Sequence, residues 1–165
     1  MAEAFNDTLL PAAKAERYAA LAQEVSAVLE GERNVTARLA TVAAMLAQAF
    51  EHYFWAGFYL VDPAKADELV VGPYQGTLGC LRIAFGRGVC GVAAAERRTL
   101  IVPDVEAFPG HIACDSRSRS EIVVPVLGPG GAFIGVFDAD STELAAFDET
   151  DAAGIERILS ETFGR

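Results

Sequence analysis

Three cysteines are the residues of this sequence whose side chains are best suited to covalent chemistry: Cys80, Cys90 and Cys114. Cys114 stands in a polar run of small residues that also holds Arg117 and Arg119. Nearby positive side chains favour the thiolate, which is the nucleophilic form of cysteine, although Asp115 opposes that effect. Many cysteines are small buried hydrophobes and inert. On sequence context alone, this inert role and a redox or nucleophilic role for Cys114 have about equal weight.

The other two cysteines adjoin flexible backbone, because Cys80 follows Gly79 and Cys90 precedes Gly91. Each could swing toward a partner, although a core position is the ordinary role for either one alone. An odd cysteine count does not suit a secreted disulfide framework, and no C-x-x-C or other short metal-ligand spacing occurs. His111 is expected to be a local hydrogen-bond partner that could help to keep Cys114 ionised. The pattern predicts thiol–disulfide chemistry without a metal ion.

Acidic residues near the ends of two apolar runs form the second candidate group: Glu121, Asp138 and Asp140. Asp138 and Asp140 share a face if their strand continues through Ala139, because side chains alternate along a strand. Most such acids only solvate a strand end, but beside an active loop they could bind an ammonium group or donate a proton. Trp55 and Tyr59 also share one face of a strand-like run, either as core residues or as a pocket lining.

The run from Gly86 to Gly91 fits the G-x-G-x-x-G spacing of a dinucleotide-binding loop, and Asp104 follows at a suitable distance. The helix behind it could span only about Val89–Arg97 before the next strand, which is shorter than a βα crossover requires. The chain is also too short for two mononucleotide-binding halves. We therefore expect a glycine-rich turn that lets the backbone pass close to the sheet, and no bound cofactor.

The composition is that of one globular domain, since 52% of the 165 residues are apolar and 22% are charged. The net charge is −10, from 13 basic and 23 acidic residues, and the longest basic cluster is Arg97–Arg98. A nucleic-acid binder needs a basic footprint, so this class is excluded. No apolar run reaches the ~18 residues of a transmembrane helix. The acidic N-terminus lacks a signal-peptide core, so we expect a cytoplasmic protein with no membrane partner.

Apolar residues at steps of three and four predict helices over residues 12–29, 35–50 and 144–163, the second of them capped by Asn34 or Thr36. A shorter helix is expected over Val89–Arg97. The strand-like runs are bounded by turn residues; they are Phe54–Val61, Glu68–Gly72, Leu81–Phe85, Thr99–Val102, Glu121–Val126 and Ala132–Asp138. Pro103–Ser120 has little periodicity and is expected to be a functional loop. Helices around a central run of strands predict one sheet with helices packed on a face, an α+β arrangement.

Several of these motifs together resemble one known family. The segment from Cys114-Asp115-Ser116 to Ser120-Glu121-Ile122-Val123-Val124-Pro125 strongly resembles the signature of the free methionine-(R)-sulfoxide reductases, which are single GAF domains. The other matching pieces follow in order along nearly the whole chain; they are Trp55-Ala56-Gly57-Phe58-Tyr59, Gly72-Pro73-Tyr74-Gln75-Gly76, the glycine loop from Gly86 to Gly91, and Asp138-Ala139-Asp140-Ser141. GAF domains in general are sensor modules, and the cysteine loop distinguishes this group of enzymes from them.

The resemblance implies a single GAF domain over residues 1–165, with a central antiparallel sheet flanked by the N- and C-terminal helices. It implies that Cys114 attacks the sulfur of free methionine (R)-sulfoxide and becomes a sulfenic acid. Cys80 or Cys90 then resolves this group as a disulfide, which thioredoxin reduces. Of the two, Cys80 is favoured because it ends the flexible segment that begins at Gly76.

The resemblance also implies that Glu121, Asp138 and Asp140 bind the substrate ammonium or protonate the sulfoxide oxygen. Trp55 and Tyr59 would line the methyl pocket. No metal ion and no cofactor are implied, and homodimerisation stays open. The alternative is a non-catalytic GAF module that binds a small ligand or senses oxidants through its cysteines.

Overall fold

A six-stranded antiparallel sheet forms the centre of the computed structural model, which describes residues 11–165. The strands lie in the order β3-β2-β1-β6-β5-β4. Their bounds are β1 Trp55–Asp62, β2 Lys65–Gln75, β3 Arg82–Ala84, β4 Leu100–Val102, β5 Ser120–Leu127 and β6 Phe133–Ser141. The helices are α1 Pro11–Val28, α2 Val35–Ala49, α3 Gly88–Glu96 and α4 Glu149–Phe163. The expected α+β class with a central antiparallel sheet is confirmed.

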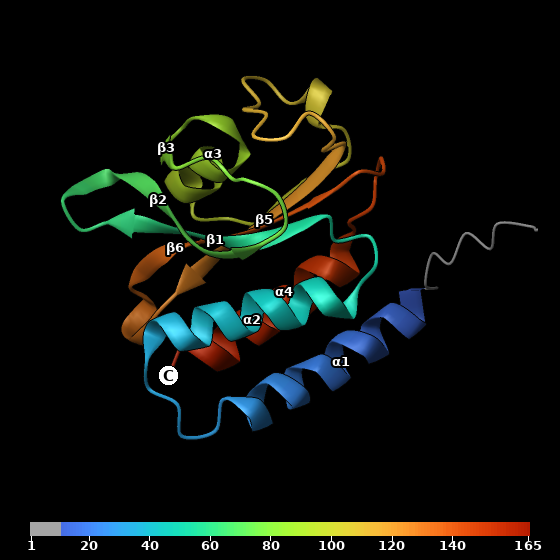
Figure 1. The fold of residues 1–165 in the computed structure, drawn as a ribbon, viewed down its shortest axis with the longest axis vertical. Helices are drawn as coiled ribbons and strands as arrows, with labels where there is room; N and C mark the ends of the chain where they lie inside the picture. The colour runs from blue at the N-terminus through green and yellow to red at the C-terminus, as the bar shows by residue number, and fades with distance from the viewer. Residues whose placement is uncertain (1–10) are drawn as a thin grey trace, which may run out of the picture.

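The helices are distributed unequally over the two faces of this sheet (Figure 1). α2 and α4 pack against one face, and α1 lies on the outer side of these two helices. The short α3 lies over the opposite face, together with the loop between β4 and β5. The main core therefore lies between the sheet and the long helices, and a smaller cluster lies beneath α3.

Alternation along the central strands assigns each side chain to one of these faces. On β1, Ala56 and Phe58 enter the core under the long helices, whereas Trp55 and Tyr59 enter the cluster beneath α3. On β6, Phe137 packs in the main core and its neighbours in the sequence, Asp138 among them, point to the α3 side. The period-two pattern thus places polar chemistry on the face with fewer helices.

Three predicted elements have wrong boundaries, and one of them is the strand predicted at Ala132–Asp138, which continues as β6 to Ser141. β2 extends beyond the predicted Glu68–Gly72, because Pro73, which has no N–H for the ladder, falls where the register with β1 shifts and a bulge accommodates it. α4 begins at Glu149 and not at Leu144. The residues before it form a turn in which the Ala145 N–H donates to the Pro103 carbonyl, and Asp148 then caps the helix.

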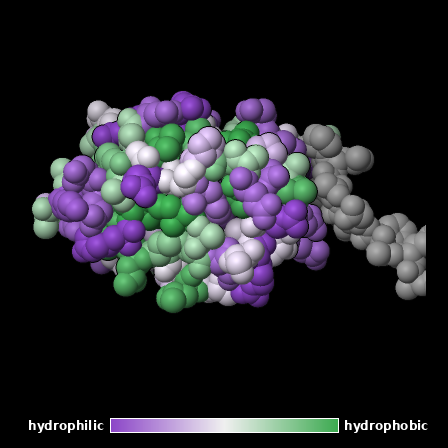
Figure 2. All heavy atoms as spheres, turned by 90° about the horizontal axis from the view of Figure 1, so that it is seen from above, coloured by the Kyte–Doolittle hydropathy of each residue, from purple (hydrophilic) through white to green (hydrophobic). Residues whose placement is uncertain are grey.

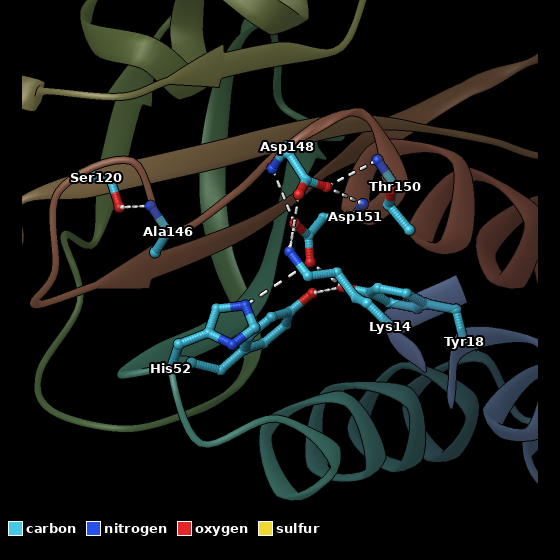
Figure 3. Close-up of polar contacts among 9 residues, drawn as sticks. Lys14, Tyr18, His52, Ser120, Ala146, Asp148, Thr150 and Asp151 are labelled. Carbon is cyan, nitrogen blue, oxygen red and sulfur yellow. Dashed lines mark hydrogen bonds and ion pairs between the residues drawn. The ribbon is translucent and has the colours of Figure 1, made fainter. Parts of the chain in front are cut away.

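A buried polar network ties α1 to the start of α4 (Figure 3). Lys14 Nζ donates to Asp151 Oδ2 at 2.8 Å and to Asp148 Oδ2 at 3.1 Å, and the Tyr18 hydroxyl donates to Asp151 Oδ1 at 2.8 Å. Burial alone would raise the pKa of Asp151, but the neighbouring His52 and Lys14 lower it to about 2. Asp151 is therefore an ionised anchor for the outer helix.

No helix in the described part of the chain, residues 11–165, has the length and apolarity needed to cross a membrane. The first ten residues, on which the expectation of a chain without a leader rests, lie outside that part.

Candidate active site

A pocket opens on the α3 side of the sheet and collects residues from distant parts of the chain. Of the eight residues singled out in the sequence, seven line it; they are Trp55, Tyr59, Cys90, Cys114, Glu121, Asp138 and Asp140. The eighth, Cys80, joins the site through a covalent bond to Cys114. The residues come from β1, β5, β6, the start of α3 and the loop between β4 and β5.

Strand register brings the three acids together on the floor of this pocket. Asp140 on β6 lies opposite Trp55 of β1 on one side and opposite Glu121 of β5 on the other. Directly opposed side chains on one face have Cβ atoms about 4.5–5.5 Å apart. Asp138 lies two residues along the same strand, so the acids form one cluster and do not solvate separate strand ends.

Two members of this acid cluster are buried, Asp140 is half-buried, and the cluster holds protons tightly. Glu121 and Asp138 are each 5% exposed. Burial raises the pKa of all three carboxyls well above the usual range, and repulsion within the cluster adds to it, from Asp140 on Glu121 and from Glu121 on Asp138. One oxygen, Asp138 Oδ1, is buried and has no hydrogen-bond partner in the described chain. The floor can therefore supply a proton, and it also has acceptor capacity for a cationic donor.

Cys90 belongs to the acid end of the pocket. It is buried, and its Sγ lies 3.9 Å from Glu121 Oε1, within range of a weak S–H donation. Burial raises the pKa of this thiol well above its ordinary value, and the charge of Asp138 adds to the effect. Cys90, Glu121 and Asp138 have ligand atoms within 4.8 Å of one another, which makes them the best-placed donors for a metal ion within residues 11–165. The same atoms suit an ammonium group.

The opposite end of the site is a disulfide between Cys80 and Cys114, with a Cα–Cα distance of 5.4 Å. Cys114 is exposed and Cys80 is half-buried. The bond joins the segment before β3 to the loop between β4 and β5, across 34 positions of sequence. Cys114 thus borders the pocket on one side and solvent on the other.

Trp55 and Tyr59 hold the segment that carries Cys80. Trp55 Nε1 donates a hydrogen bond to the Thr77 carbonyl at 2.9 Å. A Cβ at Gly79 would lie 3.0 Å from both the Trp55 ring and the Tyr59 hydroxyl, so glycine favours this close approach of the chain to the two aromatics. Their rings stack with centroids 5.7 Å apart. These residues therefore position Cys80 in addition to lining the pocket.

The polar loop around Cys114 has local partners that differ from the sequence expectation. Arg117 donates to Asp115 through Nε at 3.0 Å and a terminal nitrogen at 2.8 Å, so its charge is directed to Asp115. That contact lowers the pKa of Asp115. His111 Nε2 lies 3.5 Å from Glu121 Oε2, and burial lowers the pKa of its imidazole. His111 therefore faces the acid cluster.

The glycine loop is the close turn that the sequence predicts. Gly86 and Gly88 have φ values of 79° and 60°, which favour glycine. A Cβ at Gly91 would lie 2.3 Å from the Ala84 carbonyl oxygen of β3, so α3 begins in direct contact with the sheet edge. This contact places Cys90 over the acids.

Several residues of the site were missed in the sequence. Thr77 Oγ1 donates to Asp115 Oδ2 at 2.8 Å and so links the two cysteine segments beside the disulfide. Ser118, Arg87 and Phe54 also line the pocket. Thr77 and Ser118 are small polar residues in loops, a pattern with no periodicity that could have marked them.

Comparison with known proteins agrees with this architecture. The sequence model of the GAF domain matches residues 16–162. GAF domain-containing protein A of Dictyostelium discoideum is 51% identical over 146 residues, which are 88% of this chain and 90% of the relative. The free methionine-R-sulfoxide reductase of Escherichia coli (strain K12) is 42% identical over 148 residues, 90% of this chain and 87% of that protein.

A solved structure is similar over the same span. The X-ray structure of free methionine-R-sulfoxide reductase from Neisseria meningitidis in complex with its substrate aligns with a TM-score of 0.84 and 52% sequence identity. The alignment covers 91% of this chain and 90% of that one.

Proposed function

This chain belongs to the GAF domain family and, within it, to the free methionine-R-sulfoxide reductases, and from that premise we propose that it reduces free L-methionine (R)-sulfoxide to L-methionine. One observation carries the proposal. A disulfide between Cys80 and Cys114 lies at the rim of a pocket whose floor is a cluster of three acids, two of them buried. A GAF domain that only binds a ligand needs no redox-active disulfide beside its acidic pocket, whereas a sulfoxide reductase needs both.

The reaction begins with the reduced enzyme. The Cys114 thiolate attacks the sulfoxide sulfur while the oxygen accepts a proton from the acid cluster. The S–O bond of the substrate then breaks as the hydroxyl passes to the Cys114 sulfur, and methionine departs and leaves a sulfenic acid on Cys114. The Cys80 thiol condenses with this group, forming the disulfide and releasing water. A dithiol protein such as thioredoxin then exchanges with the disulfide and returns both cysteines to thiols.

The acids divide two tasks between them. Three neighbouring carboxyls in a buried site cannot all ionise, so at least one keeps a proton that it can give to the departing oxygen. The ionised members bind the substrate ammonium, and the unpartnered Asp138 Oδ1 is the best-placed acceptor for it. Methionine sulfoxide within a peptide has no ammonium, so the cluster accounts for selectivity toward the free amino acid.

The aromatics and the third cysteine complete the assignment. Trp55 and Tyr59 form the apolar wall against the methyl group, and they keep Cys80 within reach of Cys114. Cys80 is the proposed resolving cysteine because it already pairs with Cys114. Cys90 is the second candidate, and its position beside Glu121 supports a role as hydrogen-bond donor to the acids. The alternative is that Cys90 resolves the sulfenic acid.

The test is turnover with purified enzyme, thioredoxin, thioredoxin reductase and NADPH. We expect NADPH oxidation that depends on the R epimer of free methionine sulfoxide. The matched control substrates are the S epimer and the N-acetylated R epimer, which lacks the ammonium group. Equal rates on both epimers would contradict the proposed reaction. A single stoichiometric disulfide without turnover would instead identify an oxidant sensor.

A further inference from the structure

Exposed apolar side chains gather around the disulfide. Among residues 11–165, seven large hydrophobic residues are exposed, and the two most exposed are Leu78 at 76% and Leu81 at 69%. Ile112 is a third member of this set, at 37%. Single exposed apolar residues are ordinary on a protein surface. A group of them around a reactive bond indicates a contact surface.

Leu78, Leu81 and Ile112, here called the apolar rim, all lie within two residues of a disulfide cysteine. Leu81 follows Cys80 directly and Leu78 precedes it by two positions, while Ile112 precedes Cys114 by two. The disulfide joins the two segments, and Leu78 and Ile112 border the same pocket mouth as Cys114. Figure 2 looks down on the side where α3 and the loop between β4 and β5 lie, and hydrophobic side chains gather there among polar ones.

The disulfide at the centre of the rim must be reduced in every cycle, so the reductant has to contact the rim. To reduce the bond, a thiolate attacks one cysteine sulfur, a mixed disulfide forms, and the other sulfur leaves as a thiolate. A second thiol of the reductant then attacks the mixed disulfide, and the reductant departs oxidised. A protein thiolate can reach these sulfurs only if its surrounding surface covers the residues beside Cys80 and Cys114.

We propose that the apolar rim is the docking surface for a protein reductant with an exposed dithiol, of the thioredoxin type. This inference rests on the proposed function and adds the surface through which electrons enter. A second copy of this chain on the rim would cover the exposed Cys114 and bar the reductant. A lid over the substrate would bury its side chains, whereas Leu78 and Leu81 face solvent while Cys80 and Cys114 are joined.

The experiment compares two reductants on the same variants. Leu81→Ser removes rim surface while keeping both cysteines, and Leu81, unlike Leu78, is not among the residues that line the pocket. Leu127→Ser is the matched control, because this leucine is 44% exposed at the opposite end of β5 from Glu121. Each protein is assayed at saturating methionine (R)-sulfoxide, first with varied thioredoxin and then with dithiothreitol, which is too small to need a docking surface.

We expect Leu81→Ser to lose at least about tenfold in kcat/KM for thioredoxin, which corresponds to about 1.4 kcal/mol, with an unchanged dithiothreitol-supported rate. The Leu127→Ser control should match the wild type with both reductants. An unchanged thioredoxin kcat/KM in Leu81→Ser would overturn the proposal, as would an equal loss with both reductants or a change of oligomeric state by sedimentation. Failure of the proposed function itself would appear separately, as a wild-type enzyme that dithiothreitol cannot cycle.

Discussion

Reduction of the Cys80–Cys114 bond should destabilise the folded chain by an amount that can be worked out from its position in the sequence. The bond closes a loop of 34 positions that contains β3, α3 and β4. In the chain-entropy account, a cross-link over a loop of that length removes about 4 kcal/mol of conformational freedom from the unfolded state at 25 °C. For a chain of this size, that free energy corresponds to a shift of about 8–15 °C in Tm.

The assay is thermal unfolding of the oxidised and the reduced protein, with Cys80→Ser measured beside them. Cys80 is half-buried and Cys114 is exposed, so serine at position 80 should cost little in packing. We expect the oxidised wild type to melt highest. The reduced wild type and Cys80→Ser in either redox condition should melt lower and close together.

Cys90→Ser is the control for this measurement, because its thiol is buried at the acid end and is not in the disulfide. It should keep the full redox-dependent difference in Tm, whatever its own stability. A redox difference that survives Cys80→Ser, or one that disappears in Cys90→Ser, would refute the pairing. The second outcome would make Cys90 the resolving cysteine.

Three further predictions concern the site and its support. Cys114→Ser should lower kcat by at least about 10³-fold while leaving the circular dichroism spectrum unchanged, because a hydroxyl is a far weaker nucleophile than a thiolate. Asp138→Asn should raise KM for the free sulfoxide by about 10–100-fold, the worth of one hydrogen bond to a charged group, and should leave the redox-dependent Tm difference intact. Asp151→Asn should lower the free energy of unfolding by about 2 kcal/mol at pH 7, since the folded pKa of about 2 lies below the ordinary 3.8. That contribution is present above about pH 4 and is lost as the pH falls through 2, so urea titrations should show the wild-type advantage shrinking to about half at pH 3.

The chemistry of the strands could be predicted because strands have a period. Asp138 and Asp140 were placed on one face from their spacing alone, and the continuation of β6 through Ala139 places them so. The helices over α1 and α2 were predicted from apolar steps, and Asn34 caps α2 by accepting from the Ala37 N–H at 3.0 Å. In each case the regular backbone of a strand or helix fixes the face on which a residue lies, so the spacing of residues in the sequence predicts which side chains share a face.

Loop contacts could not be predicted, because loops have no such period. The sequence favoured Cys80 over Cys90 as the partner of Cys114 only on the flexibility of the segment that begins at Gly76, and both cysteines adjoin glycine. The segment that carries Cys80 is held near Cys114 by Trp55, whose indole N–H donates a hydrogen bond to the Thr77 carbonyl. The positive charge of Arg117 was expected to act on the thiol, but Arg117 instead pairs with the carboxylate of Asp115.

The position of Cys114 between two surfaces imposes an order on the proposed cycle. The substrate must approach from the side of Glu121 and Asp138, because an ammonium ion finds its acceptors there. The reductant must approach from the solvent side, since the acid side is a pocket too confined for a protein. In the oxidised state the Cys114 sulfur is bonded to Cys80, so it cannot attack a sulfoxide until the reductant has acted. Substrate and reductant therefore alternate at one sulfur atom, and steady-state kinetics varied in both should give parallel double-reciprocal lines, as a ping-pong mechanism requires.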